Sequence, residues 1–155
     1  MEALQALYAG DLERARRLLP PDGELSVFEA AAFGRVQRLR EILQNDPALA
    51  RAWSVDGFTP LHLAIFGDQP EAARLLIEHG ADLNAVSRAS FAQVPPLGTA
   101  AFVRSVELTQ LLLERGADVN ARSSGGLTAL DTAYANDDVP LIRLLESRGG
   151  VRGGA

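Results

Sequence analysis

Apolar residues recur along this chain at the i, i+3, i+4 spacing that lines one face of a helix. Four such triplets follow one another: Leu39, Ile42 and Leu43; Ala72, Leu75 and Leu76; Leu108, Leu111 and Leu112; Leu141, Leu144 and Leu145. An alanine in an apolar turn precedes each triplet: Ala31, Ala64, Ala100 and Ala133. Both markers recur at intervals of 33, 36 and 33 residues. Their shared spacing indicates an internal repeat, which is typical of stacked architectures.

Within each repeat, the pattern predicts a helix, a turn, a second helix and a loop. Thr59-Pro60 offers a capping hydroxyl followed by proline at the first helical position, and Ser26 to Glu29 forms a capping box. A glycine closes three of the second helices, where a left-handed backbone is needed: Gly80, Gly116 and Gly149. Short helices with small residues between them are stable only when neighbouring pairs stack, which predicts an all-α solenoid.

The repeat spacing also divides the chain. We expect four repeats at about 24–52, 53–85, 86–121 and 122–149. Residues 1–23 match the first repeat at an offset of 24, with a shorter connecting loop, and are predicted to form a shortened helix pair that caps the end of the stack. The glycine-rich residues 150–155 are predicted to fray.

Composition narrows the function classes. The chain has 155 residues, 47% of them hydrophobic, a net charge of −5 and no cysteine. The negative net charge argues against a nucleic-acid or anionic-membrane binder. The lack of cysteine excludes disulfides and thiolate metal sites. The longest uncharged stretch, residues 89–103, is interrupted by prolines and too short for a bilayer, which needs ~20 residues. The acidic N-terminal segment is unlike an export signal, which favours a cytoplasmic location.

Two segments carry a family resemblance. GFTPLHLA at 57–64, continued by RLLIEHGADLNA at 74–85, resembles an ankyrin repeat, and LLLERGADVNA at 111–121 repeats the second half. The resemblance implies antiparallel helix pairs, β-hairpin-like finger loops and a concave face that binds another protein. The absence of lysine among the 15 basic residues favours a GC-rich, bacterial genome.

The departures from the family pattern are specific. The histidine that bonds neighbouring units in the family is kept at His62, and its counterparts are Glu29, Gly98 and Asp131. The turn glycine of the family sits one residue early at Gly34 and Gly67 and is missing around 103–104.

We find no constellation that predicts catalysis. His62 and His79 are separated by a helix pair, and no phosphate-binding loop, zinc-protease or serine-hydrolase motif is present. We therefore expect no metal, no cofactor and no enzymatic activity. A small-molecule binder or enzyme using Glu29, His62 and Asp131 along one edge is the alternative.

An aromatic position recurs two residues after the repeat alanines, at Phe33, Phe66 and Phe102, with Ala135 in the last repeat. By the resemblance this position faces the concave groove, where aromatic anchors are typical binding hot spots. Alternatively, each phenylalanine packs only against the neighbouring inner helix.

The finger loops supply the other candidate contacts. Trp53 and Val55 lie at the first tip, where Phe58 offers an alternative cover for the tryptophan. The loop between Ala85 and Pro95 is three residues longer than its neighbours, which suggests either a specificity element or an insertion without a role. The predicted partner contacts are Phe33, Trp53, Val55, Phe58, Phe66, Arg88, Phe91, Phe102 and Arg122.

The loop arginines Arg51, Arg88 and Arg122 suggest an acidic patch on the partner protein. We expect a monomeric interaction scaffold, with a self-associating homo-oligomer as the alternative.

Overall fold

The computed structural model describes residues 2–153, which form helices joined by turns and loops. The α-helices are α1 (Glu2–Tyr8), α2 (Leu12–Arg17), α3 (Val27–Ala32), α4 (Val36–Asn45), α5 (Pro60–Phe66), α6 (Pro70–Glu78), α7 (Pro96–Phe102), α8 (Val106–Glu114), α9 (Ala129–Ala135) and α10 (Val139–Ser147). Two 3₁₀ turns, η1 (Asp22–Glu24) and η2 (Pro47–Arg51), lie in the connections. Within the described chain, strand pairing is limited to one bridge between Ala89 and Ala92.

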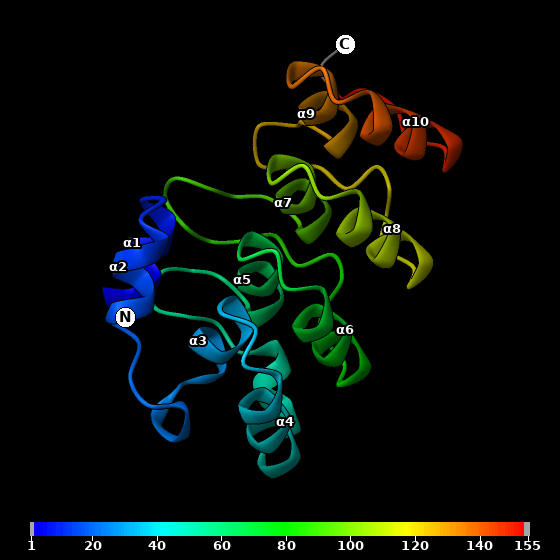
Figure 1. Ribbon diagram of the computed structural model, residues 1–155. Helices are drawn as coiled ribbons and strands as arrows, with labels where there is room; N and C mark the ends of the chain where they lie inside the picture. Colours follow the sequence, from blue (N-terminus) through cyan, green and yellow to red (C-terminus); the bar gives the residue numbers. More distant parts are fainter. Residues whose placement is uncertain (1, 154–155) are drawn as a thin grey trace.

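Helices α3 to α10 form four antiparallel pairs that stack in a row, with α3, α5, α7 and α9 in an inner layer and α4, α6, α8 and α10 in an outer layer (Figure 1). The residues that carry the repeat spacing are fully buried. They are Ala31, Ala64, Ala100 and Ala133 on the inner helices and Leu43, Leu76, Leu112 and Leu145 on the outer helices. The core therefore runs along the stack between the two layers, and the predicted solenoid is confirmed.

The predicted helix ends are also confirmed. Ser26 and Thr59 each form a capping box, with Glu29 and His62 respectively. Thr128 forms a third with Asp131. The three closing glycines have φ of +90°, +98° and +83°, as expected of residues that end a helix in the left-handed region.

The turns between inner and outer helices correct the expectation that the turn glycine sits one residue early at Gly34, because Gly34 is itself the left-handed residue of its turn. The left-handed residue of each turn is Gly34, Asp68, Arg104 or Asp137, with φ between 52° and 65°. Gly67 is not left-handed. A Cβ at Gly67 would overlap the carbonyl oxygen of Ala32 in the preceding repeat, so glycine is needed there for close packing.

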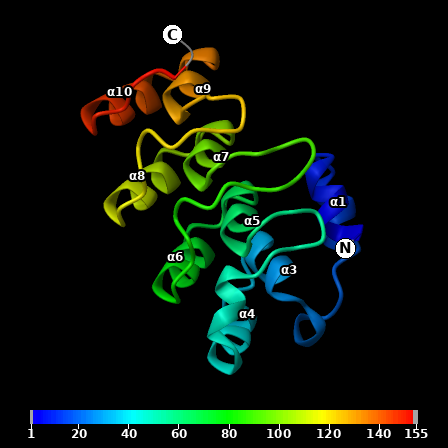
Figure 2. The ribbon, with the colours of Figure 1, turned by 180° about the vertical axis from the view of Figure 1, so that it is seen from behind.

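The N-terminal helix pair does not lie where we predicted it. It lies beside the inner layer, level with α3 and α5, instead of extending the row as an end cap (Figure 1). Seen from behind, the loops before α5 and α7 reach toward it (Figure 2). Buried Leu4 and Leu7 of α1 pack in one cluster with Phe58, Leu63 and Ala89. The apolar side of α1 is therefore buried against the inner face.

The segment after α10 corrects a second expectation. Residues 150–153 do not fray. The backbone N–H of Val151 donates to Asn120 Oδ1 at 2.8 Å, and that of Gly153 donates to Asp131 Oδ2 at 2.8 Å. The hydroxyl of Thr128 donates to the Val151 carbonyl. These bonds hold the segment across the last repeat, while residues 154–155 lie outside the described chain.

Candidate functional site

An apolar groove lies on the inner face, with a cavity of about 410 Å³. Its walls come from α1, α5 and α7, from the loop before α7, and from residues 123–132. The lining is dominated by apolar and aromatic side chains and also includes three threonines. A concave, mostly apolar site of this size is typical of binding sites in proteins.

Aromatic rings line the floor of this groove. Phe66 and Phe102 stack across neighbouring repeats, with ring centroids 6.5 Å apart and planes 11° apart. Tyr8 packs edge-on against Phe66 at 5.8 Å and also contacts Phe91 at 6.2 Å. Two of the three recurring phenylalanines, Phe66 and Phe102, thus stack on each other, and the chain's own Tyr8 contacts Phe66 from α1.

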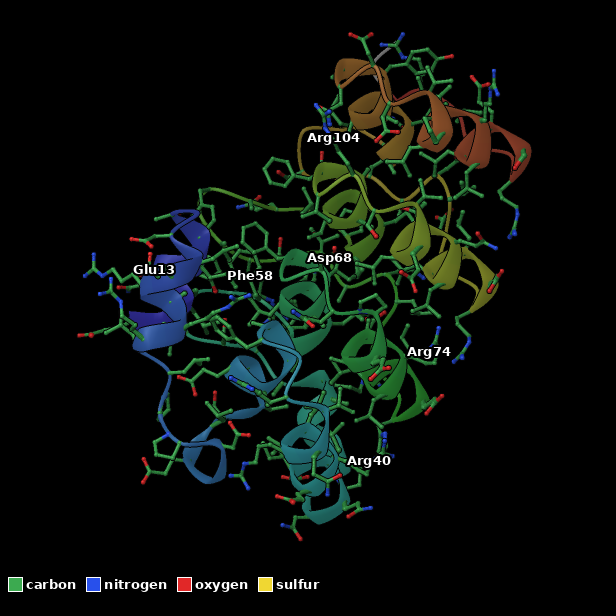
Figure 3. The ribbon with its side chains drawn as sticks, in the orientation of Figure 1. Glu13, Arg40, Phe58, Asp68, Arg74 and Arg104 are labelled. Carbon is green, nitrogen blue, oxygen red and sulfur yellow. The ribbon has the colours of Figure 1, made fainter. Side chains whose placement is uncertain are left out.

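The structure divides the predicted aromatic contacts into two groups. Phe91 and Phe102 line the groove and are 69% and 66% exposed, and Phe66 lines it half-buried. Phe33 is half-buried against the cluster that contains α1. Phe58 is 8% exposed and lies between the N-terminal pair and α5 (Figure 3). Little of Phe58 is left for a partner to touch, because the N-terminal pair covers it.

The fingertips interact with one another. The Arg88 guanidinium lies over the Trp53 ring, 3.8 Å from its centroid, so Arg88 covers the tryptophan. Two backbone bonds also join neighbouring fingers: Arg88 N–H to the Gly57 carbonyl at 2.7 Å, and Ser124 N–H to the Gln93 carbonyl at 3.0 Å. Val55 projects from the first tip, 91% exposed.

Arg122 is exposed but engaged within the chain. Its Nη1 donates to the carbonyls of Gly126 and Gly153, at 3.1 and 3.0 Å. Arg88 is likewise engaged, through its ring contact. Two of the three loop arginines therefore hold the chain's own surface together.

Tyr8 and Leu127 are among the groove residues that sequence reasoning missed. Leu127, just before the Thr128 cap, is 50% exposed and lines the end of the groove nearest α9. Tyr8 follows Leu4 at helical spacing, which marks it as part of the apolar side of α1. The spacing carried no information about which surface that side contacts.

His62 links two repeats beneath the groove. Its Nε2 lies 2.9 Å from the Val94 carbonyl, so this nitrogen carries the proton, and its Nδ1 accepts from the Thr59 hydroxyl at 2.7 Å. Burial lowers the pKa of His62 to about 4. The imidazole is neutral at pH 7, with both nitrogens used in structural hydrogen bonds.

Comparison with known families agrees with this geometry. The profile described as Ankyrin repeat matches residues 56–88, and the one described as Ankyrin repeats (many copies) matches residues 99–146. The chain belongs to the ankyrin repeat family. Ankyrin repeats are generally non-enzymatic domains that bind other proteins, and these repeats make the chain a protein–protein interaction module.

The chain is also similar to segments of larger proteins. It is 34% identical over 73 residues to the SMC5-SMC6 complex localization factor protein 1 of Bos taurus. It is 36% identical over 66 residues to the probable E3 ubiquitin-protein ligase XBOS31 of Oryza sativa subsp. japonica, and 36% over 67 residues to the ankyrin repeat and SAM domain-containing protein 6 of Danio rerio. These matches cover 41–47% of this ankyrin chain and 7–15% of the relatives.

None of the helices within residues 2–153 combines the length and apolar character that crossing a bilayer requires.

Proposed function

We propose that this ankyrin chain binds its partner protein in the inner-face groove, with Phe66, Phe91 and Phe102 as anchors. The observation that supports this most is the exposure of two of these rings beside an apolar cavity. Phe91 and Phe102 are each about two-thirds exposed, although both contact other aromatic residues. A preformed apolar surface that leaves large rings in water is typical of an interaction site.

The fingertips extend the proposed surface. Trp53 and Val55 lie beside Phe91 around a second hollow of about 440 Å³. Backbone bonds between the fingers hold these loops in place, so a partner meets a largely preformed surface. Because Arg88 and Arg122 have contacts within the chain, the proposal relies on apolar contacts, and an acidic patch on the partner is a secondary feature.

Alanine variants of the exposed anchors test the proposal. The wild-type protein is used to capture partners from an extract of its native cells, and the affinity of the captured protein is then measured by calorimetry. Phe91→Ala and Phe102→Ala are each expected to weaken binding by about 2 kcal/mol, roughly 30-fold. Val139→Ala is the matched control, because Val139 is 51% exposed on α10, outside the groove.

Unchanged affinity of both phenylalanine variants would place the binding surface elsewhere. Light scattering on the same samples separates a distinct partner from a second copy of the chain. A dimer that is lost in Phe91→Ala and Phe102→Ala would assign the groove to self-association.

A further inference from the structure

The N-terminal helix pair occupies one end of the proposed groove. Leu4 and Leu7 of α1 are buried against Phe58, Leu63 and Ala89, which belong to the inner face and its fingers. Ala32 belongs to the same cluster, so the pair covers surface of the first three repeats that the inner face would otherwise present to a partner.

Helix α1 is amphipathic, and its apolar side faces the repeats. Leu4 and Leu7 are 0% and 6% exposed, and Tyr8 continues the same side into the groove. In contrast, Leu12 at the start of α2 is 52% exposed. The inner face thus holds a short helix whose contacts follow an i, i+3, i+4 pattern.

The surface under α1 continues into the open part of the groove. Tyr8 contacts Phe58, Phe66 and Phe91, with centroids 5.6–6.2 Å apart, and Phe66 in turn stacks on Phe102. Beyond Tyr8 the lining runs on to residues 123–132, next to α9. A helix longer than the seven residues of α1 would cover both parts.

Where α1 packs on the repeats, two buried polar atoms among residues 2–153 lack hydrogen-bond partners. Within the described chain, the Tyr8 hydroxyl and Asp56 Oδ2 are buried without a hydrogen-bond partner. Burial and the nearby Asp56 carboxylate also raise the pKa of Tyr8. A buried polar group without a partner destabilises the packing of α1 on the inner face. Release of the N-terminal pair from the inner face would return both groups to water.

The pair also has little stability of its own. Helices α1 and α2 have seven and six residues, too few to persist in water without packing partners. The connection to α3, residues 18–26, contains Pro20 and Pro21 and a 3₁₀ turn. The pair therefore depends on its packing against the inner face for its helical structure.

We propose that residues 2–17 are an internal occupant of the groove, and that the partner displaces them with an amphipathic helix of its own. This inference rests on the proposed function and specifies the partner's chemistry. The partner helix carries leucines and an aromatic residue at the spacing of Leu4, Leu7 and Tyr8. It is longer than α1, so that it also reaches Phe102 and Leu127.

The test uses the 155-residue chain and a fluorescein-labelled peptide of residues 2–19, EALQALYAGDLERARRLL. Leu4→Glu places a charge in the buried contact and is expected to release the pair. Leu12→Glu makes the same change at the exposed leucine and is the matched control. Fluorescence anisotropy should show at least tenfold tighter peptide binding by Leu4→Glu than by wild type or Leu12→Glu, because the tethered segment competes at high effective concentration.

Two further measurements make the result specific. Adding Phe66→Ala to Leu4→Glu should abolish the gain in peptide affinity. Hydrogen exchange should become fast in residues 2–17 of Leu4→Glu, while α3 to α10 stay protected. Equal peptide affinity in all three proteins, or loss of protection throughout α3 to α10, would overturn the proposal.

The peptide experiment is independent of the native partner. Failure of peptide binding alongside an intact effect of Phe91→Ala and Phe102→Ala on the native partner refutes only the internal occupant. Loss of both effects refutes the groove itself.

Discussion

Acidification is expected to destabilise the fold through His62, and the structure sets both the pH window and the size of the effect. Burial lowers the pKa of His62 to about 4 from an ordinary value of 6.5. The unfolded chain therefore binds a proton at this residue before the folded chain does. Stability from the neutral imidazole is complete above pH 6.5 and is lost as the pH falls toward 4. Each pKa unit corresponds to 1.36 kcal/mol, so the full loss is about 3 kcal/mol.

Urea unfolding of wild type and His62→Gln at pH 7, 6, 5 and 4.5 measures this contribution. Groups that titrate in both proteins cancel in the difference, and the wild type should lose more stability than the variant over this range. The pKa of His62 can also be measured directly by NMR titration, because the sequence has two histidines, His62 and His79, and each gives its own ring signal. A His62 midpoint near 6.5, or parallel pH profiles for the two proteins, would refute the reasoning.

Three further predictions concern the turns and the C-terminal segment. Gly67→Ala should lower the free energy of unfolding by about 3 kcal/mol in urea titrations, because its Cβ would overlap the Ala32 carbonyl. An unchanged midpoint would contradict this close approach. Arg104→Gly should raise stability by about 1 kcal/mol, since φ at Arg104 is +60°; a destabilised variant would show that the arginine is not strained. Asp131→Asn should accelerate amide exchange at Gly153 about tenfold, and unaltered exchange would show that this carboxylate does not hold the segment.

The Asp131 carboxylate titrates in a separate window from His62. Burial alone would raise the pKa of Asp131, but hydrogen bonds from the Thr128 and Gly153 backbone and from Arg152 lower it to about 2. The stability from these bonds is present above pH 3.8 and is lost as the pH falls through 2. The stability lost through His62 between pH 6.5 and 4 and the stability lost through Asp131 between pH 3.8 and 2 therefore fall in separate parts of one pH profile.

The repeats could be predicted from the sequence because their signals are local and recur. The repeat alanines, the leucine triplets and the Thr59-Pro60 cap each report on one or two turns of chain, and stacking only multiplies them. The cross-repeat role of His62 followed from the family resemblance, and the structure shows the bond to Val94.

What the sequence left open was decided by contacts between distant segments. Residues 2–17 have the same apolar spacing whether they cap the stack or lie on the inner face, so their pattern does not distinguish the two. The cover of Trp53 was equally open, because Arg88 lies 35 positions away in the next finger. Residues 150–153 have the composition of a free glycine-rich end. Their backbone N–H groups donate to the side chains of Asn120 and Asp131, and such donors leave no pattern in the sequence of the segment itself.

The contact between Trp53 and Arg88 gives the molecule a built-in spectroscopic probe. Trp53 is the single tryptophan of the sequence, so all indole emission comes from one fingertip. Its ring is stacked under a cation from the neighbouring finger, and any movement that separates the two loops changes the polarity around the indole. Unlabelled protein can therefore be titrated with a candidate ligand, and a shift in emission wavelength reports directly on the spacing of the fingers.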